Sequence, residues 1–98
     1  MNTNQVINKL QLGLKQKGYI VTVHRRQNYS VERGRFYTTY TIYRDRKKLH
    51  QSHSAIVIIK YLATILDYVK TLNSSQLDSR GIDTRIEKEV EKRWQKED

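Results

Sequence analysis

The segment 36–44 constrains this chain more than any other, because all but the last of its residues are aromatic or β-branched. Such residues favour extended strands, in which successive side chains point to opposite faces of a sheet. One face would carry Phe36, Thr38, Tyr40 and Ile42, and the other Tyr37, Thr39, Thr41 and Tyr43. A single strand has no stability of its own, so the chain must supply neighbouring strands.

Two flanking segments predict those neighbours. Residues 19–25 are again β-branched and aromatic and predict the first strand, while the polar segment 26–35, which contains Gly34, predicts an exposed connecting loop. After the central strand, Asp45 and Arg46 form a tight turn, and residues 47–52 return as a short third strand with Leu49 facing inward. We therefore expect a three-stranded antiparallel sheet.

Three segments show helical periodicity. Residues 4–17 have apolar side chains at three- and four-residue spacing and are followed by Gly18, a residue typical of helix ends. Residues 55–72, preceded by Ser52 and Ser54 as candidate N-caps, are apolar almost all round, which is typical of a buried helix or one shared with a partner. The last segment, 82–96, has a narrow apolar stripe on a charged helix, formed by Ile82, Ile86, Val90 and Trp94.

These elements predict a single small α+β domain. Its core is a helix, a three-stranded antiparallel sheet and a second helix over residues 1–72, followed by a loop at 73–81. An extra charged helix within 82–98 would pack on that core or on a partner chain. Helices should cover one face of the sheet and leave exposed the face with Tyr37, Thr39, Thr41 and Tyr43. With 98 residues and no cysteine, the chain can build one core and no disulfide or thiolate metal site.

Positive charge is concentrated in one half of the chain. The net charge is +9, and residues 1–53 alone carry eleven basic side chains against two acidic ones, whereas residues 54–98 carry eight of each. A concentrated positive field attracts polyanions, whereas a mixed one does not. The expected partner is therefore nucleic acid or an acidic protein surface.

The candidate binding residues are cations interleaved with aromatic rings. Cations neutralise phosphates, and rings stack on unpaired bases. The set comprises Arg25, Arg26, Tyr29, Arg33, Arg35, Tyr37, Arg44, Arg46, Lys47 and Lys48. The alternative is that the tyrosines serve only as strand formers and the charges only as a solvated surface.

Catalysis has less support in the sequence. His50 and His53 lack enough nearby ligands for a metal, so no metal or cofactor is expected. Ser52, His53 and Asp45 lack the strand–turn–helix elbow of a nucleophilic triad. One enzymatic alternative stays open, a metal-free ribonuclease with His24 as general base, but we expect a binding protein without catalytic activity.

The order helix–strand–strand–strand–helix over residues 4–72 resembles the double-stranded-RNA-binding domain and the similar HicA-type toxins. The first family has a basic patch at the start of its second helix, where this chain reads Ser52-His53-Ser54. The toxins place a histidine after a glycine on the second strand, where this chain reads Arg33-Gly34-Arg35-Phe36. The resemblance therefore implies the fold and no site residues.

The composition, rich in Asn, Gln, Lys, Ile and Tyr and without Pro or Cys, resembles that of small accessory proteins of phages and mobile elements from AT-rich Gram-positive bacteria. Such proteins often inhibit host machinery, including CRISPR effectors. The second hypothesis is therefore a phage-encoded inhibitor or regulator of a host protein, of the anti-CRISPR kind. The apolar helix 55–72 and the stripe of helix 82–96 would provide apolar surface for contact with such a host protein. The stripe also predicts a homodimer.

The sequence predicts a cytoplasmic protein with no membrane partner. Its first residues lack the basic and apolar regions of a signal peptide, and its longest apolar stretch, 55–66, is interrupted by Lys60.

Overall fold

The structure, a computed structural model, describes residues 2–96 and has the expected α+β architecture. Three strands form one antiparallel sheet in the order β1-β2-β3, preceded by one helix and followed by three more. The elements are α1 (Thr3–Gln16), β1 (Thr22–Ser30), β2 (Arg35–Arg44), β3 (Lys47–Ser52), α2 (Ala55–Val69), α3 (Ser74–Leu77) and α4 (Ile82–Lys96). The predicted order is confirmed, with α3 as an addition; Met1 and residues 97–98 of the predicted segments lie outside the described residues.

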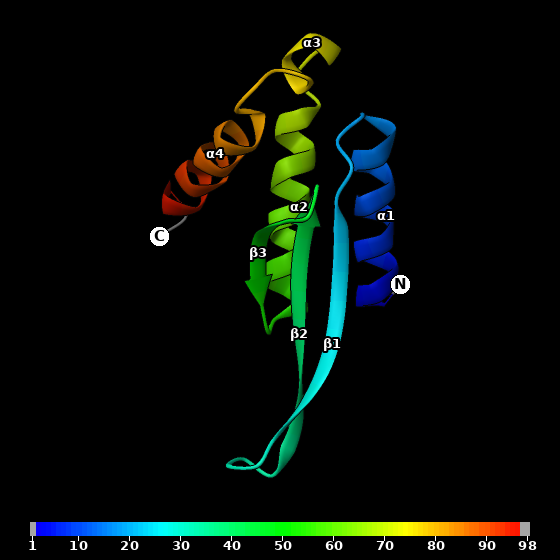
Figure 1. The fold of residues 1–98 in the computed structure, drawn as a ribbon, viewed down its shortest axis with the longest axis vertical. Coiled ribbons are helices and arrows are strands. Elements are labelled where there is room, and N and C mark those ends of the chain that lie inside the picture. Colours follow the sequence, from blue (N-terminus) through cyan, green and yellow to red (C-terminus); the bar gives the residue numbers. More distant parts are fainter. Residues whose placement is uncertain (1, 97–98) are drawn as a thin grey trace.

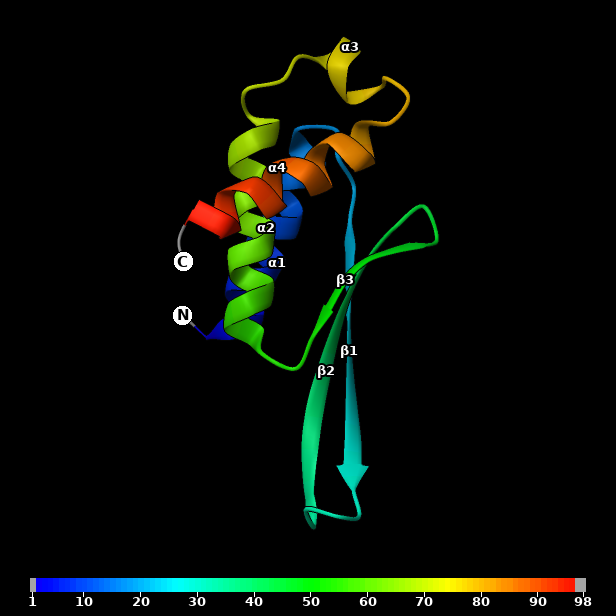
Figure 2. The same ribbon diagram turned by 90° about the vertical axis from the view of Figure 1, so that its left-hand side faces the viewer.

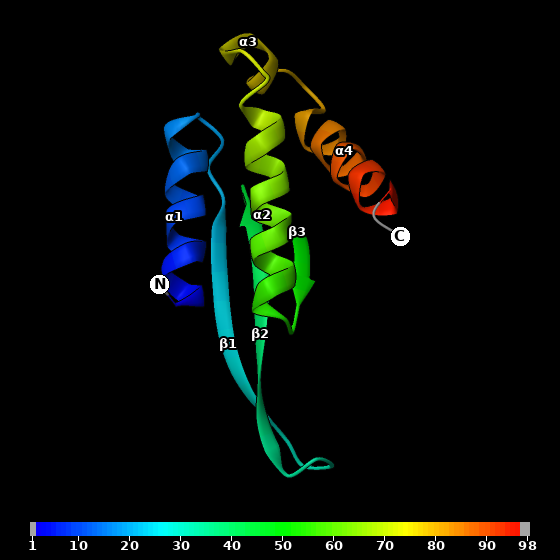
Figure 3. The ribbon, with the colours of Figure 1, turned by 180° about the vertical axis from the view of Figure 1, so that it is seen from behind.

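Helices cover one face of the sheet and leave the other open. Figure 1 shows the strands from their open side, and Figure 3 shows the opposite side, where α1 and α2 lie in front of the strands. In Figure 2 both helices lie on one side of the sheet. The hairpin of β1 and β2 continues beyond the helices, which gives the molecule a length of 49 Å against 28 Å in the other two directions. The outer end of the hairpin thus has no helix on either face.

The core lies between the sheet and α2. Tyr40 and Ile42 of β2 belong to the buried cluster, together with Ile58, Leu62 and Ile65 of α2, which are fully buried. α1 approaches α2 closely at Gly13, where an added Cβ would lie 3.2 Å from a methyl carbon of Leu66. The strongly apolar helix predicted from the sequence is therefore the centre of this domain.

The predicted loop at 26–35 is wrong in part. Residues 26–30 continue β1 and pair with residues 35–39 of β2, so that only residues 31–34 form the connection, with Gly34 at a φ of 63°. The predicted start of the first strand, at Tyr19, is also wrong, since β1 begins at Thr22 while Tyr19 itself is buried beside it. Polar residues 26–30 form a strand because their backbone pairs with β2, although neither face of this part is buried under a helix.

The predicted loop at 73–81 contains a single helical turn, α3. Asn73 and Gln76 form a reciprocal capping box, and Leu77 is buried. The preceding helix ends at Val69 rather than at residue 72, and Ser54 is its N-cap, since its side chain accepts a hydrogen bond from the Val57 amide. The buried leucine ties this connection to the core and orders it.

The C-terminal helix packs on its own domain. Ile82, Ile86 and Val90 are buried in the common core, and Trp94 packs against it. His50 of β3 stacks on Tyr61 of α2 at a centroid distance of 4.6 Å, and the indole of Trp94 meets both rings edge-on. A homodimer through this stripe would require α4 to leave the core, so the covered stripe no longer supports that prediction.

A polar cluster joins α4 to the sheet. The Arg44 guanidinium lies 2.9 Å from the Asp83 carboxylate and 3.9 Å from the centre of the Tyr19 ring. The Tyr19 hydroxyl donates to the same carboxylate oxygen at 2.8 Å. Burial and the neighbouring Asp83 raise the pKa of Tyr19 far above its usual value, so this hydroxyl stays a donor.

No helix among the described residues is long and apolar enough to cross a membrane.

Replacing Asp83 with alanine should lower the free energy of unfolding by about 1–3 kcal/mol, because two partly buried donors, those of Arg44 and Tyr19, lose their charged acceptor. Urea denaturation measures the effect. Glu91→Ala, at an exposed position of the same helix, is the matched control and should change the stability little. Equal losses in both variants would contradict the role of the cluster.

Stability should also fall in acid through His50. Burial lowers the pKa of His50 below its ordinary value of 6.5, so the folded state favours the neutral ring. The corresponding contribution to stability is present above pH 6.5 and is lost as the pH falls from there through the folded-state pKa. Urea unfolding at a series of pH values, followed by the emission of Trp94, the single tryptophan, measures this loss. His50→Phe should flatten the dependence, and an unchanged slope would refute the assignment.

Candidate functional site

The open face of the sheet carries the most chemically varied side chains of the molecule. His24, Arg26 and Asn28 of β1 pair with Thr41, Thr39 and Tyr37 of β2, and paired residues of antiparallel strands share a face. The third strand adds Gln51, the partner of Thr41. Since Tyr40 and Ile42 lie in the core, the predicted choice of exposed face is confirmed.

The middle of this face is not fully exposed, contrary to expectation. Thr39 and Thr41 are only 7% and 8% exposed, because longer side chains on β1 and after β3 stand on either side of them. The two threonines therefore form a floor between two walls.

Hydrogen bonds cross this floor. Asn28 Nδ2 donates to Thr39 Oγ1 at 3.3 Å, and the same oxygen lies 3.1 Å from His53 Nδ1. The hydroxyl has one proton and two acceptor lone pairs, so while it accepts from Asn28 it can donate its own proton to His53 Nδ1. The tautomer of His53 that completes the chain carries its proton on Nε2, which leaves that N–H without a partner in this chain of hydrogen bonds.

Aromatic rings stand at both ends of the floor. At one end, the rings of His24 and Tyr43 meet edge-on at 5.0 Å, and at the other, those of Tyr37 and His53 meet edge-on at 5.3 Å. Each tyrosine is thus held by a different histidine.

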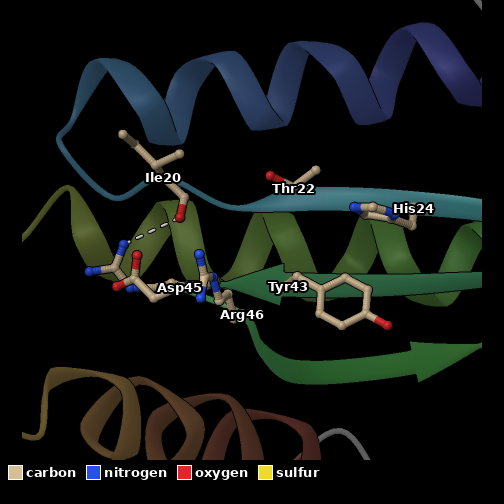
Figure 4. Close-up of a pocket in the computed structure, with 7 residues that line it drawn as sticks. Ile20, Thr22, His24, Tyr43, Asp45 and Arg46 are labelled. Atoms are coloured by element: carbon tan, nitrogen blue, oxygen red, sulfur yellow. Dashed lines mark hydrogen bonds between the residues drawn. The ribbon is translucent and has the colours of Figure 1, made fainter.

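Three neighbouring hollows lie along this face and share lining side chains. The first, of about 510 Å³, lies between the start of β1 and the Asp45–Arg46 turn, where Figure 4 shows His24 and Tyr43 on neighbouring strands. It shares these two rings with a middle hollow of about 480 Å³ over the threonine floor. The middle hollow shares Tyr37 and His53 with a third, of about 370 Å³, that includes Glu32 and Arg33. We call this row of three hollows the open-face groove.

Several predicted cations line the open-face groove. Arg26 borders its middle, Arg46 one end and Arg33 the other. Arg25 also lines the middle hollow, but it pairs with Tyr40, a residue of the covered face. All four are exposed. Arg35 is exposed and pairs with Ser30 beside the Arg33 end. Lys48 pairs with Tyr43, and its ammonium donates to the wall residue Gln51 at 3.2 Å.

Other predicted residues lie elsewhere. Arg44 touches the first hollow, but its guanidinium is held by Asp83, and Lys47 is directed to Glu87 of α4 at 4.0 Å. Tyr29 pairs with Phe36 on the opposite face of the hairpin, where their exposed rings meet at 5.0 Å. The stripe of Ile82, Ile86, Val90 and Trp94 packs inside the domain.

The sequence placed Thr39, Thr41 and Tyr43 on the exposed face without a binding role, and it gave no indication that Asn28, Gln51 and His53 line the groove. Had residues 26–30 been assigned to a strand, their alternation would have put Asn28 on the face of Tyr37. His53 follows the last strand, and nothing in the sequence indicates that its ring turns back to the sheet.

The open-face groove has no evident metal site. Among residues 2–96, no group of three or more His, Asp or Glu side chains could hold a metal ion. His24 and His53, the two histidines of the groove, contact different tyrosines at its two ends, so the ribonuclease hypothesis gains no paired acid and base.

Comparisons of the chain with known protein families, curated protein sequences and solved structures find no match. The resemblance to double-stranded-RNA-binding domains and HicA-type toxins thus extends to the order of elements alone.

The hydrogen-bond chain predicts the tautomer of His53. In the neutral ring, ¹⁵N chemical shifts should show a proton on Nε2 and none on Nδ1. Thr39→Val, which removes the hydroxyl and keeps the shape, should produce a mixture of tautomers. A proton found on Nδ1 in the unaltered protein would contradict the arrangement, and His24 in the same spectra is the internal control.

Proposed function

We propose that this protein binds nucleic acid through the open-face groove and has no catalytic activity of its own. The observation that carries the proposal is the charge along the groove. Four exposed arginines line it, besides Arg44, which Asp83 holds, whereas the carboxylates that line it among the described residues are Asp45 and Glu32, one at each end. A hollow lined in this way attracts a chain of phosphates.

The arginines are available for this task. Arg25, Arg26, Arg33 and Arg46 are exposed, and none forms an ion pair with another residue in the range 2–96. The acidic residues of the second half, by contrast, pair mainly with cations around α4, as Asp67 and Glu89 do with Arg93. Asp83 and Glu87 pair with Arg44 and Lys47 of the first half, so the charge that is left without a partner on the sheet is that of the exposed arginines.

The side chains between the arginines also suit nucleic acid. Asn, Gln, Thr and His offer donors and acceptors of the kind that recognise base edges, and Tyr37 and Tyr43 offer aromatic faces. A surface kept only for solubility has no need of a polar floor or of rings at both ends. The proposed binding combines phosphate contacts at the rim with base contacts in the floor.

Removing two groove arginines should weaken binding and reduce its dependence on salt. We expect the double variant Arg26→Ala/Arg46→Ala to lower affinity about tenfold or more at low salt. The slope of log K against log salt should also fall by about 1.5–2, because each lost phosphate contact removes roughly one unit. Fluorescence anisotropy with labelled 12-nucleotide strands and duplexes at several salt concentrations measures both quantities.

The matched control is Arg80→Ala/Arg85→Ala, which removes the same charge from two exposed positions, one just before α4 and one near its start. It should leave affinity and slope nearly unchanged. Equal losses in the two double variants would mean that net charge alone attracts the ligand, and no binding of any probe at low salt would end the proposal.

A protein partner is the second candidate, favoured by a different surface. Tyr29, Val31 and Phe36 are 54%, 86% and 65% exposed at the free end of the hairpin, on residues that no helix covers. Exposed apolar clusters of this kind often mark protein contacts, as an inhibitor of a host nucleic-acid enzyme, such as a CRISPR effector, would need. Such a complex would tolerate salt and would weaken in Phe36→Ser, whereas nucleic-acid binding would not.

A further inference from the structure

The open-face groove is recessed along its centre. The short side chains of Thr39 and Thr41 form the floor of β2, whereas longer side chains rise on both sides, among them Arg26 on β1 and Gln51 on β3. The threonines are the only polar residues among the buried set of the described chain. The sheet therefore presents a trough, because the side chains that form its walls are longer than those that form its floor.

This shape disfavours a duplex as ligand. A β-ribbon that reads duplex DNA must push the side chains of its strands into the major groove, about 12 Å wide, until they reach base edges. On a recessed face, the long side chains of the walls would contact the phosphate backbones of a duplex first. The short side chains of β2 would then not reach the base edges. A single strand can enter the trough, because its bases are not held inside a helix.

The two tyrosines supply places for unpaired bases. Tyr37 and Tyr43 lie six residues apart on β2, a distance of about 20 Å at the usual strand rise. Each ring meets its neighbouring histidine edge-on, with interplanar angles of 89° for Tyr37 and 76° for Tyr43. Bases of a single strand stack on such rings, whereas those of a duplex are already stacked on one another.

Polar groups between the rings can meet base edges. The Asn28 amide and the Gln51 amide stand on opposite walls, and His53 has a second ring nitrogen, Nε2, that the Thr39 hydroxyl does not use. Single-stranded bases expose their Watson–Crick edges to groups of this kind. Cations lie at the rim and the ends, where the phosphates of a strand in the trough would be.

We infer that the ligand of the open-face groove is a single strand of nucleic acid, which runs along β2 and stacks bases on Tyr37 and Tyr43. The inference rests on the proposed function and restricts its ligand from nucleic acid in general to single strands. The distance between the rings suits a site of about four nucleotides, the lower end of the range for single-strand-binding folds.

The test compares single strands with duplexes at constant salt. Labelled 12-nucleotide DNA and RNA strands of mixed sequence, and the duplexes formed from each, are titrated with the full chain in anisotropy measurements. We expect the single strands to bind at least tenfold more tightly than their duplexes. A difference between DNA and RNA strands would support the inference and identify the sugar that the groove prefers.

Two substitutions test the rings. Tyr37→Leu and Tyr43→Leu keep an apolar strand residue but remove the aromatic face, and each should weaken single-strand binding about tenfold and duplex binding less than twofold. Tyr29→Leu, on the opposite face of the same hairpin, is the matched control and should change neither. Thermal unfolding of each variant excludes a loss of folding as the cause, and the Tyr37 variant is the more secure, since its ring is 41% exposed.

The outcomes separate this inference from the proposed function. If duplexes bind as tightly as single strands, or if the two tyrosine variants bind normally while Arg26→Ala/Arg46→Ala is weakened, the single-strand inference is wrong and nucleic-acid binding stands. If no probe binds at low salt, both are wrong.

Discussion

The packing of Tyr40 and Ile42 against α2 determines how the rest of the molecule can be used. These two residues bury one face of the sheet in the aliphatic core, together with Ile58 and Leu62. Because strand residues alternate between faces, burying this set turns Tyr37, Thr39, Thr41 and Tyr43 to the other side. The helices that cover the first face, α1 and α2, leave the second open along all three strands (Figures 1 and 3). The proposed binding surface is thus a direct consequence of one-sided packing.

The same packing divides the charges of the chain into two groups. Arg44 lies near the end of β2, where α4 crosses, and Asp83 on that helix holds its guanidinium with Tyr19 beside it. The arginines farther along the hairpin lie beyond the reach of the helices that carry most of the acidic residues, so they keep an uncompensated charge. From the sequence alone, Arg44 and the hairpin arginines cannot be distinguished, because both are basic. The difference arises because the partner of Arg44 is 39 residues away and is brought near only by the docking of α4.

Sequence patterns predicted the parts of the fold that bury apolar surface. The central strand and the long helices have periodic apolar residues, and the turn at Asp45 and Arg46 with the short third strand follows from them; the structure contains each of these elements. Residues 26–30 were missed because this part of the hairpin buries neither face, so the alternation that identifies a strand is absent. The candidate site was predictable in its cations and in Tyr37, whereas its walls depend on strand register and on the turn that brings His53 back to Thr39.

The claim that the open-face groove is the binding surface can be tested most directly by NMR titration of the isotope-labelled protein with a 12-nucleotide single strand. The account predicts that the side-chain amides of Asn28 and Gln51, the methyl groups of Thr39 and Thr41, and the rings of Tyr37 and Tyr43 shift together and saturate at one ratio. The ring signals of Tyr29 and Phe36 on the opposite face, and those of Trp94 in the core, should stay unchanged. Shifts confined to Tyr29 and Phe36, or spread evenly over exposed cations of both halves, would contradict the account.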